Sequence, residues 1–560
     1  MVAQMFEMKN LHLRHRIRTA LSRLYWLARI ISGNSRGSRE RALRRALFWR
    51  KSVLGLVLCL SSGLLPAAEP GAAEIRTPKP PAEPRINGAG IFGVRPGSQF
   101  LYHIPVTGER PIEYSVAHLP TGLTLDSKTG MITGSLKGKG EHDVLLRAKN
   151  AKGQAEKKFR IVVGEEIALT PPMGWNSWNC WGPTVDGEKV LKSARAMAKS
   201  GLMEHGWSYI NIDDAWQGKR GGKFNGLQGN DKFPDMKGLC DQIHALGLKA
   251  GIYSTPWVTS YAEYPGGSAE NPEGTWSKPT VPKRGNVNKK ILPWAIGRYH
   301  FATNDAQQWA EWGIDYLKYD WNPNEEPETR EMRDALRSSG RDIVFSLSNN
   351  MPFTNAPALS KLANCWRTTG DTRDNWQSMS SKGFGQDKWE PYHSPGHWND
   401  PDMLVVGYVG GWGGRQPKPS GLTPDELYTH ISLWCLVSSP LLIGCDLERL
   451  DDFTMNLLSN DEVLAVSQDS LGKQAICVSK EGDARVYAKD LEDGSKAVGL
   501  FNAGSNGSVK VTVKWPDLKL SGKLTVRDLW RQKEVGKFDG QFELPIPPHG
   551  AELVKVSKGR

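Results

Sequence analysis

Four apolar runs of this chain end in an aspartate that stands beside an aromatic residue. They are Tyr209–Asp214, Leu317–Asp320, Trp366–Asp371 and His397–Asp402. An apolar run that stops at carboxylates is typical of a buried strand with a functional end. Several such ends in one domain predict that carboxylates from different strands meet in one polar pocket, as they do in a parallel β/α barrel.

Two of these carboxyl groups could share an acid–base reaction. Asp320 and Asp371 end the predicted fourth and sixth strands, so both should face the mouth of a barrel. Hydrolysis of a glycosidic bond needs one ionised carboxylate, which attacks carbon or activates water, and one protonated carboxyl group, which donates to the leaving oxygen. Lys318 should face the same way as Asp320 and help to keep a carboxylate ionised. A structural Lys318–Asp320 ion pair and a role for Asp374 instead of Asp371 are the alternatives.

The elements that must position these residues alternate between strands and helices from residue 166 to about 445. Amphipathic helices are predicted over 188–198, 305–312 and 423–434, and the segment 255–300 reads as a long insertion that forms an active-site wall. Eight strands are expected near 172–177, 208–213, 248–254, 314–320, 342–347, 365–370, 397–404 and 440–445. This repeat predicts a closed (β/α)8 TIM barrel.

Short strand candidates separated by Gly-rich turns flank the barrel on both sides. We therefore predict a multidomain protein with an N-terminal β-sandwich, a central (β/α)8 TIM barrel and a C-terminal antiparallel β-sandwich. The expected divisions are a basic leader and signal peptide, a Pro-rich linker, the N-terminal sandwich, the barrel and the C-terminal sandwich, at 1–68, 69–84, 85–164, 166–465 and 466–557.

The first residues resemble a secretory signal. A basic segment precedes the apolar run Ser52–Leu65 and the small residues Ala67 and Ala68, which predicts export to the periplasm or the extracellular space; an N-terminal membrane anchor is the alternative. Residues 1–51 carry thirteen Lys or Arg against two acidic residues, and so hold +11 of the net charge of +12. The rest is nearly neutral, so its charge predicts neither nucleic-acid nor membrane binding.

Six cysteines follow the leader, and no two of them form a close C-x-x-C pair. They are Cys180, Cys240, Cys365, Cys435, Cys445 and Cys477. This spacing argues against a zinc site, and most of them stand in apolar runs, which predicts buried free thiols.

Together these motifs resemble the α-galactosidases of glycoside hydrolase family 27, over roughly residues 165–555. The segments that carry the resemblance are Leu169–Trp178, Asn211–Trp216, Gly251–Tyr253, Leu317–Asp320, Trp366–Arg367, Trp398–Met403 and Ser467–Lys473. The segment Leu119–Gly134 is similar to the Ig-like module that often accompanies secreted bacterial enzymes, so this resemblance implies that residues 85–164 form an N-terminal Ig-like β-sandwich.

The resemblance implies a retaining exo-α-galactosidase that needs no metal or organic cofactor and acts on terminal α-galactosyl groups of an oligosaccharide or polysaccharide. It assigns Asp320 as the nucleophile and Asp371 as the acid/base, and it places Asp213 and Asp214 on hydroxyls 4 and 6 of the sugar. Trp175 is expected as the aromatic platform. Further sugar contacts are expected from Tyr253, Lys318, Arg367 and Asp402. For Trp178 and Trp181, the sequence predicts core packing and sugar contact equally.

The loop after the fifth strand departs from the family pattern. Ser348 stands near a position where galactosidases carry a glutamate that reads the 2-hydroxyl, and where animal N-acetylgalactosaminidases carry a serine. α-N-Acetylgalactosaminidase and β-L-arabinopyranosidase activities are therefore alternatives within the family. A carbohydrate-binding protein without catalysis is the alternative outside it, and the presence of both Asp320 and Asp371 argues against that function.

Overall fold

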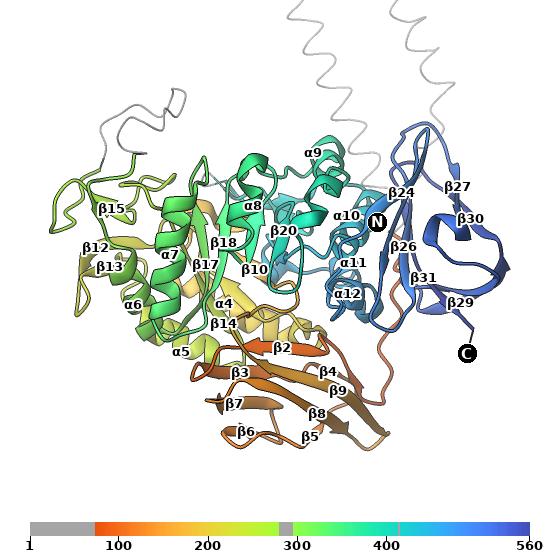
Figure 1. Cartoon of the computed structure of the whole chain (residues 1–560), viewed down its shortest axis with the longest axis horizontal. Coiled ribbons are helices and arrows are strands. Elements are labelled where there is room, and N and C mark those ends of the chain that lie inside the picture. The colour runs from red at the N-terminus through yellow and green to blue at the C-terminus, as the bar shows by residue number, and fades with distance from the viewer. Residues whose placement is uncertain (1–72, 279–294, 413–414, 560) are drawn as a thin grey trace, which may run out of the picture. The chain divides into compact units, whose positions relative to one another are not determined.

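The computed structural model describes residues 73–278, 295–412 and 415–559, so the predicted leader and residues 279–294 of the predicted insertion lie outside the described residues. Within the described part, three regions with separate hydrophobic cores follow one another along the chain (Figure 1). None of the described helices is long and apolar enough to cross a lipid bilayer. The domain boundaries expected from composition stay predictions.

Eight parallel strands form the central sheet, in the order β20-β19-β18-β17-β14-β11-β10-β23. Their bounds are β10 Met173–Asn176, β11 Tyr209–Asn211, β14 Lys249–Ser254, β17 Ile314–Asp320, β18 Val344–Ser348, β19 Cys365–Arg367, β20 Trp398–Asp400 and β23 Leu441–Ile443. A parallel bridge between Leu404 and Ile443 joins the two ends of this order and closes the ring. The predicted TIM barrel is thereby confirmed, with strands at all eight expected places.

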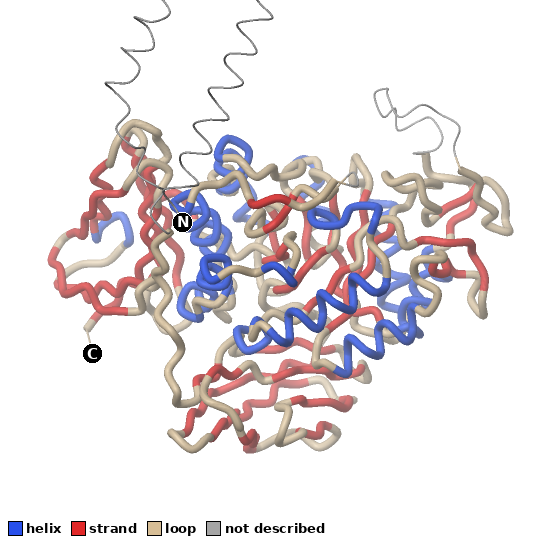
Figure 2. Tube along the Cα trace, turned by 180° about the vertical axis from the view of Figure 1, so that it is seen from behind, coloured by secondary structure: helices blue, strands red, loops and turns tan. Residues whose placement is uncertain are grey.

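Helices cover the outside of the barrel (Figure 2). They are α3 Trp178–Trp181, α4 Gly187–Lys199, α5 Met236–Ala245, α6 Ala302–Trp312, α7 Glu326–Ser338, α8 Ala356–Leu359, α9 Trp376–Gly383, α10 Pro424–Leu436, α11 Asp452–Leu458 and α12 Asp461–Ser467. Helix α10 begins with a capping box between Thr423 and Glu426. Nearly all of its residues are buried, because it packs between the barrel and the C-terminal sandwich.

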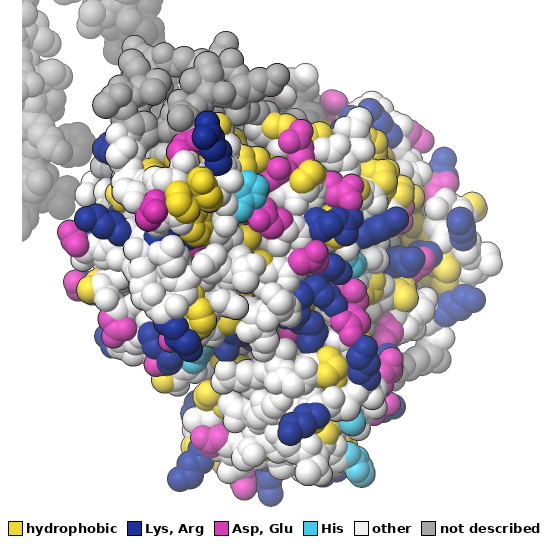
Figure 3. All heavy atoms as spheres, turned by 60° about the vertical axis from the view of Figure 1, so that its left-hand side comes forward, with side chains coloured by type: hydrophobic (Ala, Val, Ile, Leu, Met, Phe, Trp, Pro, Cys, Tyr) yellow, Lys and Arg dark blue, Asp and Glu magenta, His cyan; other side chains and the backbone are white. Residues whose placement is uncertain are grey.

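Three small two-stranded sheets are inserted in the loops of the barrel. They pair β12 Gln217–Gly221 with β13 Gly226–Gly229, β15 Ser268–Ala269 with β16 Tyr299–His300, and β21 Tyr408–Val409 with β22 Lys418–Pro419. On the side of the molecule that carries β12, β13 and β15, acidic and basic side chains are mixed with small hydrophobic groups (Figure 3). This mixture agrees with a folded part that carries little net charge.

The N-terminal region is a β-sandwich made of a four-stranded sheet, β2-β9-β8-β5, and a three-stranded sheet, β3-β7-β6, with β1 paired to β4. Its strands are β1 Arg85–Ile86, β2 Ile91–Val94, β3 Gln99–His103, β4 Val106–Thr107, β5 Glu113–Ala117, β6 Leu123–Leu125, β7 Met131–Ser135, β8 Gly140–Lys149 and β9 Gln154–Val163. Its core is separate from that of the barrel and includes Phe100, Ile132, Phe159 and Ile161.

Polar contacts fasten the N-terminal sandwich to the barrel. The Arg95 guanidinium donates to Asp342 Oδ1 at 2.6 Å, and the Arg95 backbone N–H donates to Asp342 Oδ2 at 2.9 Å. The Ser98 hydroxyl adds a third bond to Asp342, at 2.9 Å. Asp342 lies just before β18, so this sandwich is tied to the ends of the barrel strands opposite the predicted site.

The C-terminal region is an antiparallel β-sandwich of a six-stranded sheet, β24-β25-β26-β31-β28-β29, and the pair β27-β30. Its strands are β24 Ile476–Glu481, β25 Ala484–Asp490, β26 Lys496–Asn502, β27 Val509–Lys514, β28 Lys523–Asp528, β29 Lys533–Asp539, β30 Gln541–Ile546 and β31 Ala551–Lys558. Alternating buried residues of these strands fill a third core, which includes Val498, Leu500, Val511 and Val513.

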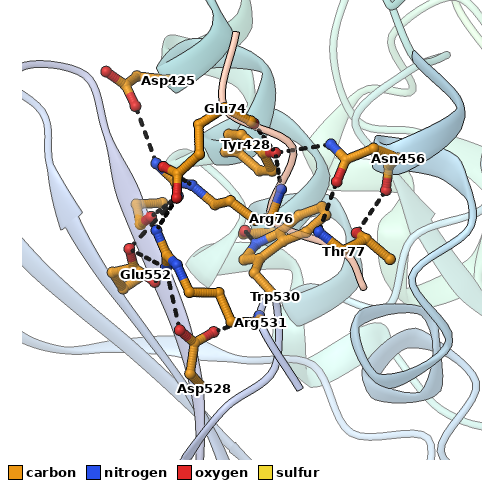
Figure 4. A network of polar contacts seen from close by, with 12 residues as sticks. Glu74, Arg76, Thr77, Asp425, Tyr428, Asn456, Asp528, Trp530, Arg531 and Glu552 are labelled. Atoms are coloured by element: carbon orange, nitrogen blue, oxygen red, sulfur yellow. Dashed lines mark hydrogen bonds and ion pairs between the residues drawn. The ribbon is translucent and has the colours of Figure 1, made fainter. Parts of the chain in front are cut away.

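The segment Glu74–Thr77, which belongs to the predicted linker, is held between the barrel and the C-terminal sandwich (Figure 4). The Arg76 guanidinium lies 4.0 Å from the centre of the Tyr428 ring of α10 and donates to the Ala551 carbonyl of β31 at 3.1 Å. Glu74 accepts a bond from Arg531 at 2.9 Å. The start of the described chain therefore contacts its last domain.

Candidate active site

Asp320 is the last residue of β17 and is 6% exposed at the mouth of the barrel. Its Oδ1 accepts a hydrogen bond from the Asn349 side-chain amide at 2.8 Å. Asn349 follows β18 and has a φ of +75°, and its carbonyl accepts a bond from Asn322 Nδ2 at 2.7 Å. Asparagine tolerates this left-handed conformation better than most residues, so the turn aims its amide at the carboxylate.

Lys318 lies two residues before Asp320 and is paired with a different carboxylate. Its Nζ donates to Asp213 Oδ2 at 2.8 Å, and the same oxygen accepts a bond from Asn176 Nδ2 at 2.8 Å. Burial alone would lower the pKa of Lys318, but the negative charges of Asp213 and Asp320 outweigh it and raise that pKa. Lys318 is thus a fixed cation between two carboxylates, and the ion pair with Asp320 that was the structural alternative is not formed.

Asp214 is fully buried and is held by backbone and side-chain donors. Its Oδ2 accepts from the Ala262 backbone N–H at 2.8 Å, and its Oδ1 accepts from Gln217 Nε2 at 3.0 Å. Burial raises the pKa of Asp214, while hydrogen bonds from Ser260, Ala262 and Gln217 oppose the shift. The pair Asp213-Asp214 is therefore a rigid part of the barrel mouth rather than a solvated turn.

Arg367 at the end of β19 connects the other two predicted carboxylates. Its Nη1 lies 2.7 Å from Asp402 Oδ1, and its Nη2 lies 3.3 Å from Asp371 Oδ1. Asp402 is buried and also accepts the Thr372 backbone N–H at 2.6 Å, whereas the Asp371 side chain is 79% exposed. Asp371 thus stands at the outer edge of the site, and Asp402 lies inside it.

Asp374, the alternative to Asp371, has partners of its own. Its Oδ2 accepts the Gly421 backbone N–H at 3.0 Å and lies 3.3 Å from Lys418 Nζ. These contacts hold Asp374 against the loop that precedes α10.

Two tyrosines complete the ring of polar groups. Tyr253 of β14 is fully buried, and its hydroxyl has no hydrogen-bond partner among the described residues. Burial and the charges of Asp214, Asp320 and Asp213 raise its pKa well above the usual value, so the hydroxyl stays protonated. Tyr261 lies in the insertion, near both Asp320 and Asp371. Burial raises its pKa, and the charges of these two carboxylates raise it further. Its hydroxyl is hydrogen-bonded to the Asn349 side chain.

Ser348 ends β18 and pairs in register with Asp320 of β17. It is 3% exposed and borders a small cavity of about 20 Å³ inside the barrel, together with Lys318, Arg367 and Asp402. Its side chain therefore faces the barrel axis beneath the site. Because the Ser348 side chain is short, Asn349 rather than a long carboxylate side chain occupies the space above it.

The two candidate reacting groups differ in their environments. Burial raises the pKa of Asp320 to about 7; the Lys318 charge opposes this shift, and the charges of Asp213 and Asp371 add to it. For Asp371, neighbouring groups limit its hydration and so raise the pKa, but the charges of Arg367 and Lys318 outweigh this effect and hold the pKa below the usual value. The last proton of this pair is therefore lost near pH 7.

Trp175 was predicted as the aromatic platform, and the structure shows this prediction to be wrong. Trp175 is completely buried in the main core, and its indole N–H donates to the Cys445 carbonyl at 2.8 Å. Side chains alternate along β10, so Trp175 points away from the pocket while Asn176 points toward Asp213. Trp178, beyond the end of the strand, is only partly buried and lines an open cleft.

The other predicted site residues lie together. The structure gathers Asp213, Asp214, Tyr253, Lys318, Asp320, Ser348, Arg367, Asp371 and Asp402 at one end of the barrel. Sequence reasoning did not find Tyr261 or Asn176. The alternation of side chains along a strand could have identified Asn176, because Asn176 follows Trp175 and so faces the other side of the sheet. No local signal distinguishes Tyr261 within the insertion.

Five of the cysteines are buried and Cys477 is half-buried, and all six are free thiols, as predicted. Among residues 73–278, 295–412 and 415–559, no three His, Cys, Asp or Glu side chains are grouped so that they could hold a metal ion. That the reaction needs no cofactor stays a prediction.

Three family models match separate parts of the chain. Residues 170–273 and 286–469 match the family model "Alpha galactosidase A", and residues 481–556 match "Alpha galactosidase C-terminal beta sandwich domain". Residues 83–164 match the model "Putative Ig domain".

Several relatives match this chain over most of their own length. Alpha-galactosidase 2 of Arabidopsis thaliana is 37% identical over 71% of this chain and 92% of its own length. Alpha-galactosidase A of Cellvibrio japonicus is 34% identical over 70% of this chain and 93% of its own length. The crystal structure of alpha-galactosidase I from Mortierella vinacea is 31% identical, covers 70% of this chain and 97% of its own, and superposes with a TM-score of 0.57.

The solved structure of an enzyme with a different activity is also similar. A β-L-arabinopyranosidase from Geobacillus stearothermophilus is 30% identical over 70% of this chain and 97% of its own, with a TM-score of 0.60. The family match over the barrel, the relatives that match over most of their length and the ring of carboxylates in the barrel mouth agree. The chain belongs to the α-galactosidase family of glycoside hydrolases, family 27.

Proposed function

We propose that this protein is a retaining exo-α-galactosidase that releases terminal α-D-galactosyl groups from oligosaccharides or polysaccharides. The observation that carries the proposal is the asymmetric pair in the barrel mouth. Asp320 is buried and oriented by Asn349, whereas Asp371 is exposed at the rim beside Arg367. A group that attacks the sugar belongs inside the pocket, and a group that meets the leaving part of the glycan belongs at its entrance.

The reaction then proceeds in two displacements. The Asp320 carboxylate attacks the anomeric carbon as the glycosidic C–O bond breaks, and Asp371 gives its proton to the leaving oxygen. A water molecule next loses a proton to Asp371 and attacks the same carbon, which breaks the ester bond to Asp320. Below pH 7 the one proton of the pair rests on Asp320, so the reactive state forms when that proton moves to Asp371 and leaves Asp320 ionised. The configuration at the anomeric carbon is retained.

The fixed polar groups support a galactosyl group as the sugar. Asp213 and Asp214 offer carboxylate oxygens that would accept hydrogen bonds from hydroxyls 4 and 6, and Lys318 fixes the orientation of Asp213 at 2.8 Å. The Tyr253 hydroxyl, which has no hydrogen-bond partner in the described part of the chain, is a further group that a sugar would satisfy. A site with buried polar groups discriminates strongly against a substrate that lacks the matching hydroxyl.

One observation favours a second activity. Ser348 is short and faces the barrel axis, so the 2-position of the sugar is not closed by a glutamate. α-N-Acetylgalactosaminidase is therefore the second candidate. β-L-Arabinopyranosidase is the third, because its substrate would leave unpaired the carboxylate that is expected to bind the 6-hydroxyl.

A substrate panel tests the proposal. We expect release from aryl α-D-galactoside to exceed release from its 2-acetamido analogue and from aryl β-L-arabinopyranoside by at least about 10-fold in kcat/KM. Asp320→Asn should abolish turnover with an unchanged circular dichroism spectrum. No release from any of the three substrates, or near-normal turnover by Asp320→Asn, would contradict the assignment.

We also propose that the protein is exported after cleavage of a signal peptide within residues 1–68. The basic segment and the apolar run Ser52–Leu65 support this proposal. N-terminal sequencing of the protein from the extracellular or periplasmic fraction of its source tests it. A start at Met1 in that fraction, or an intact leader in the membrane fraction, would contradict it.

A further inference from the structure

A cleft of about 820 Å³ opens beside the candidate active site. Aromatic side chains from four separate segments line it, and they are Trp178, Tyr264, Trp276 and Trp412. Trp412 is 51% exposed. Strand β12 carries part of the lining. Its volume is within the range of small-ligand sites.

Three links tie the cleft to the predicted sugar carboxylates. Gln217 and Ala262, which line the cleft, donate the hydrogen bonds to Asp214 at 3.0 and 2.8 Å. The Trp178 backbone N–H donates to Asn176 Oδ1 at 2.9 Å, and Asn176 donates in turn to Asp213. The cleft and the pocket therefore share one wall, and a chain-like ligand can occupy both.

The floor and one wall of the cleft are rigid. Arg220 lies 2.6 Å from the buried Asp305 and stacks over the Phe301 ring at 4.0 Å. The Trp276 indole N–H donates to the Thr259 hydroxyl at 2.9 Å, which fixes the ring. Preformed aromatic faces with fixed orientation reduce the entropy cost of binding.

The lining combines flat apolar faces with charged groups. The rings can stack on the C–H faces of sugars, and Lys219, Glu273 and Lys278 at the exposed edge can bond to hydroxyls. An uncharged, hydroxyl-rich chain fits this mixture better than a phosphorylated or strongly acidic ligand, because acidic and basic groups alternate along the edge.

We propose that this cleft is a glycan-binding subsite that holds a second segment of the same glycan whose terminal sugar enters the barrel. This inference rests on the proposed α-galactosidase function and deepens it, because it makes a branched or extended glycan the preferred substrate. A substrate with only an aryl leaving group leaves the cleft empty, whereas a galactosyl-branched polysaccharide fills it.

Paired kinetics with Trp412→Ala test the subsite. Trp412 is half-exposed, so its truncation should leave the fold intact. We expect KM for a galactosyl-branched polysaccharide to rise about three- to tenfold, which is the loss that one aromatic contact produces, while kcat/KM for aryl α-galactoside stays unchanged. Ile476→Ala, which removes a 42%-exposed apolar side chain from β24, should change neither value.

Tyr264→Ala provides a second variant from another segment of the lining and should reproduce the polysaccharide-specific loss. Equal effects of Trp412→Ala and Tyr264→Ala on both substrates, or no effect on either, would overturn the subsite while wild-type cleavage of the aryl galactoside upholds the proposed function. If the wild-type protein does not cleave the aryl galactoside, the proposed function itself fails, and the subsite fails with it.

Discussion

The side-chain amide of Asn349 donates a 2.8 Å hydrogen bond to Oδ1 of Asp320, and Asn349 itself stands in the left-handed region at a φ of +75°. A donor held against a carboxylate favours its ionised form and fixes its rotamer. Because Asn322 anchors the backbone of Asn349, the orientation of the reacting carboxylate depends on a turn outside its own strand.

Asn349→Gly removes this donor while keeping a residue that accepts positive φ. We expect kcat/KM to fall about 10- to 100-fold, the loss expected for one hydrogen bond to a charged group, with little change in thermal stability. Asn350→Gly is the matched control, because Asn350 also has a positive φ, +62°, and is exposed. Equal kinetics for the two variants would show that the Asn349 amide does not position Asp320.

The pH dependence of the reaction should follow from the shared proton of Asp320 and Asp371. Burial raises the pKa of Asp320 to about 7, and Arg367 lowers that of Asp371. Above pH 7 both groups are ionised and no acid remains for the leaving oxygen. We therefore expect a bell-shaped kcat/KM profile with its alkaline limb near pH 7, measured on aryl α-galactoside.

Lys318→Met should shift the alkaline limb of the kcat/KM profile against pH. The Lys318 charge lowers the pKa of Asp320, so its removal raises this pKa and shifts the alkaline limb to higher pH. The activity at the optimum should also fall, because Asp213 loses its 2.8 Å partner. Lys318→Arg keeps the charge and should leave the limb in place. A limb that does not move in Lys318→Met would contradict the electrostatic role.

Asp371 and Asp374 provide a direct test of the acid assignment. We expect Asp371→Asn to slow cleavage of alkyl and sugar leaving groups by about 100-fold or more, and cleavage of an acidic phenol leaving group much less, because that leaving group needs little protonation. Asp374→Asn should behave like the wild type, since Asp374 is bound to Gly421 and Lys418. The reverse pattern would assign the acid to Asp374.

Several of these residues could be predicted from the sequence, and the reasons differ. Apolar runs that end in aspartate located the barrel strands and the residues Asp213, Asp214, Asp320, Asp371 and Asp402, because a strand's period of two is a local property. Trp175 was assigned to the wrong face of its strand, because a shift of one residue at the end of a short strand moves the side chain to the opposite face. Tyr261 reaches the site only through the tertiary path of an insertion, which has no periodic pattern.

The Ig-like sandwich is expected to stabilise the barrel rather than to swing freely. Asp342→Ala removes three bonds to Arg95 and Ser98 and leaves a mostly buried guanidinium without its carboxylate. We expect a loss of about 2–4 kcal/mol in the free energy of unfolding, seen as an earlier first transition in calorimetry, with unchanged kcat. Asp143→Ala, in which an 86%-exposed partner of Arg160 is removed, should leave the transitions unchanged.

The contacts of Glu74, Arg76 and Thr77 join the start of the described chain to helix α10, to Asn456 of α11 and to the last strand. These residues lie far from Asp320 in the fold and touch none of the reacting groups. Removing the residues up to and including Thr77 should therefore yield an enzyme that still cleaves its substrate at low temperature but is inactivated sooner on heating. In this protein, heat tolerance and turnover can be altered independently of each other.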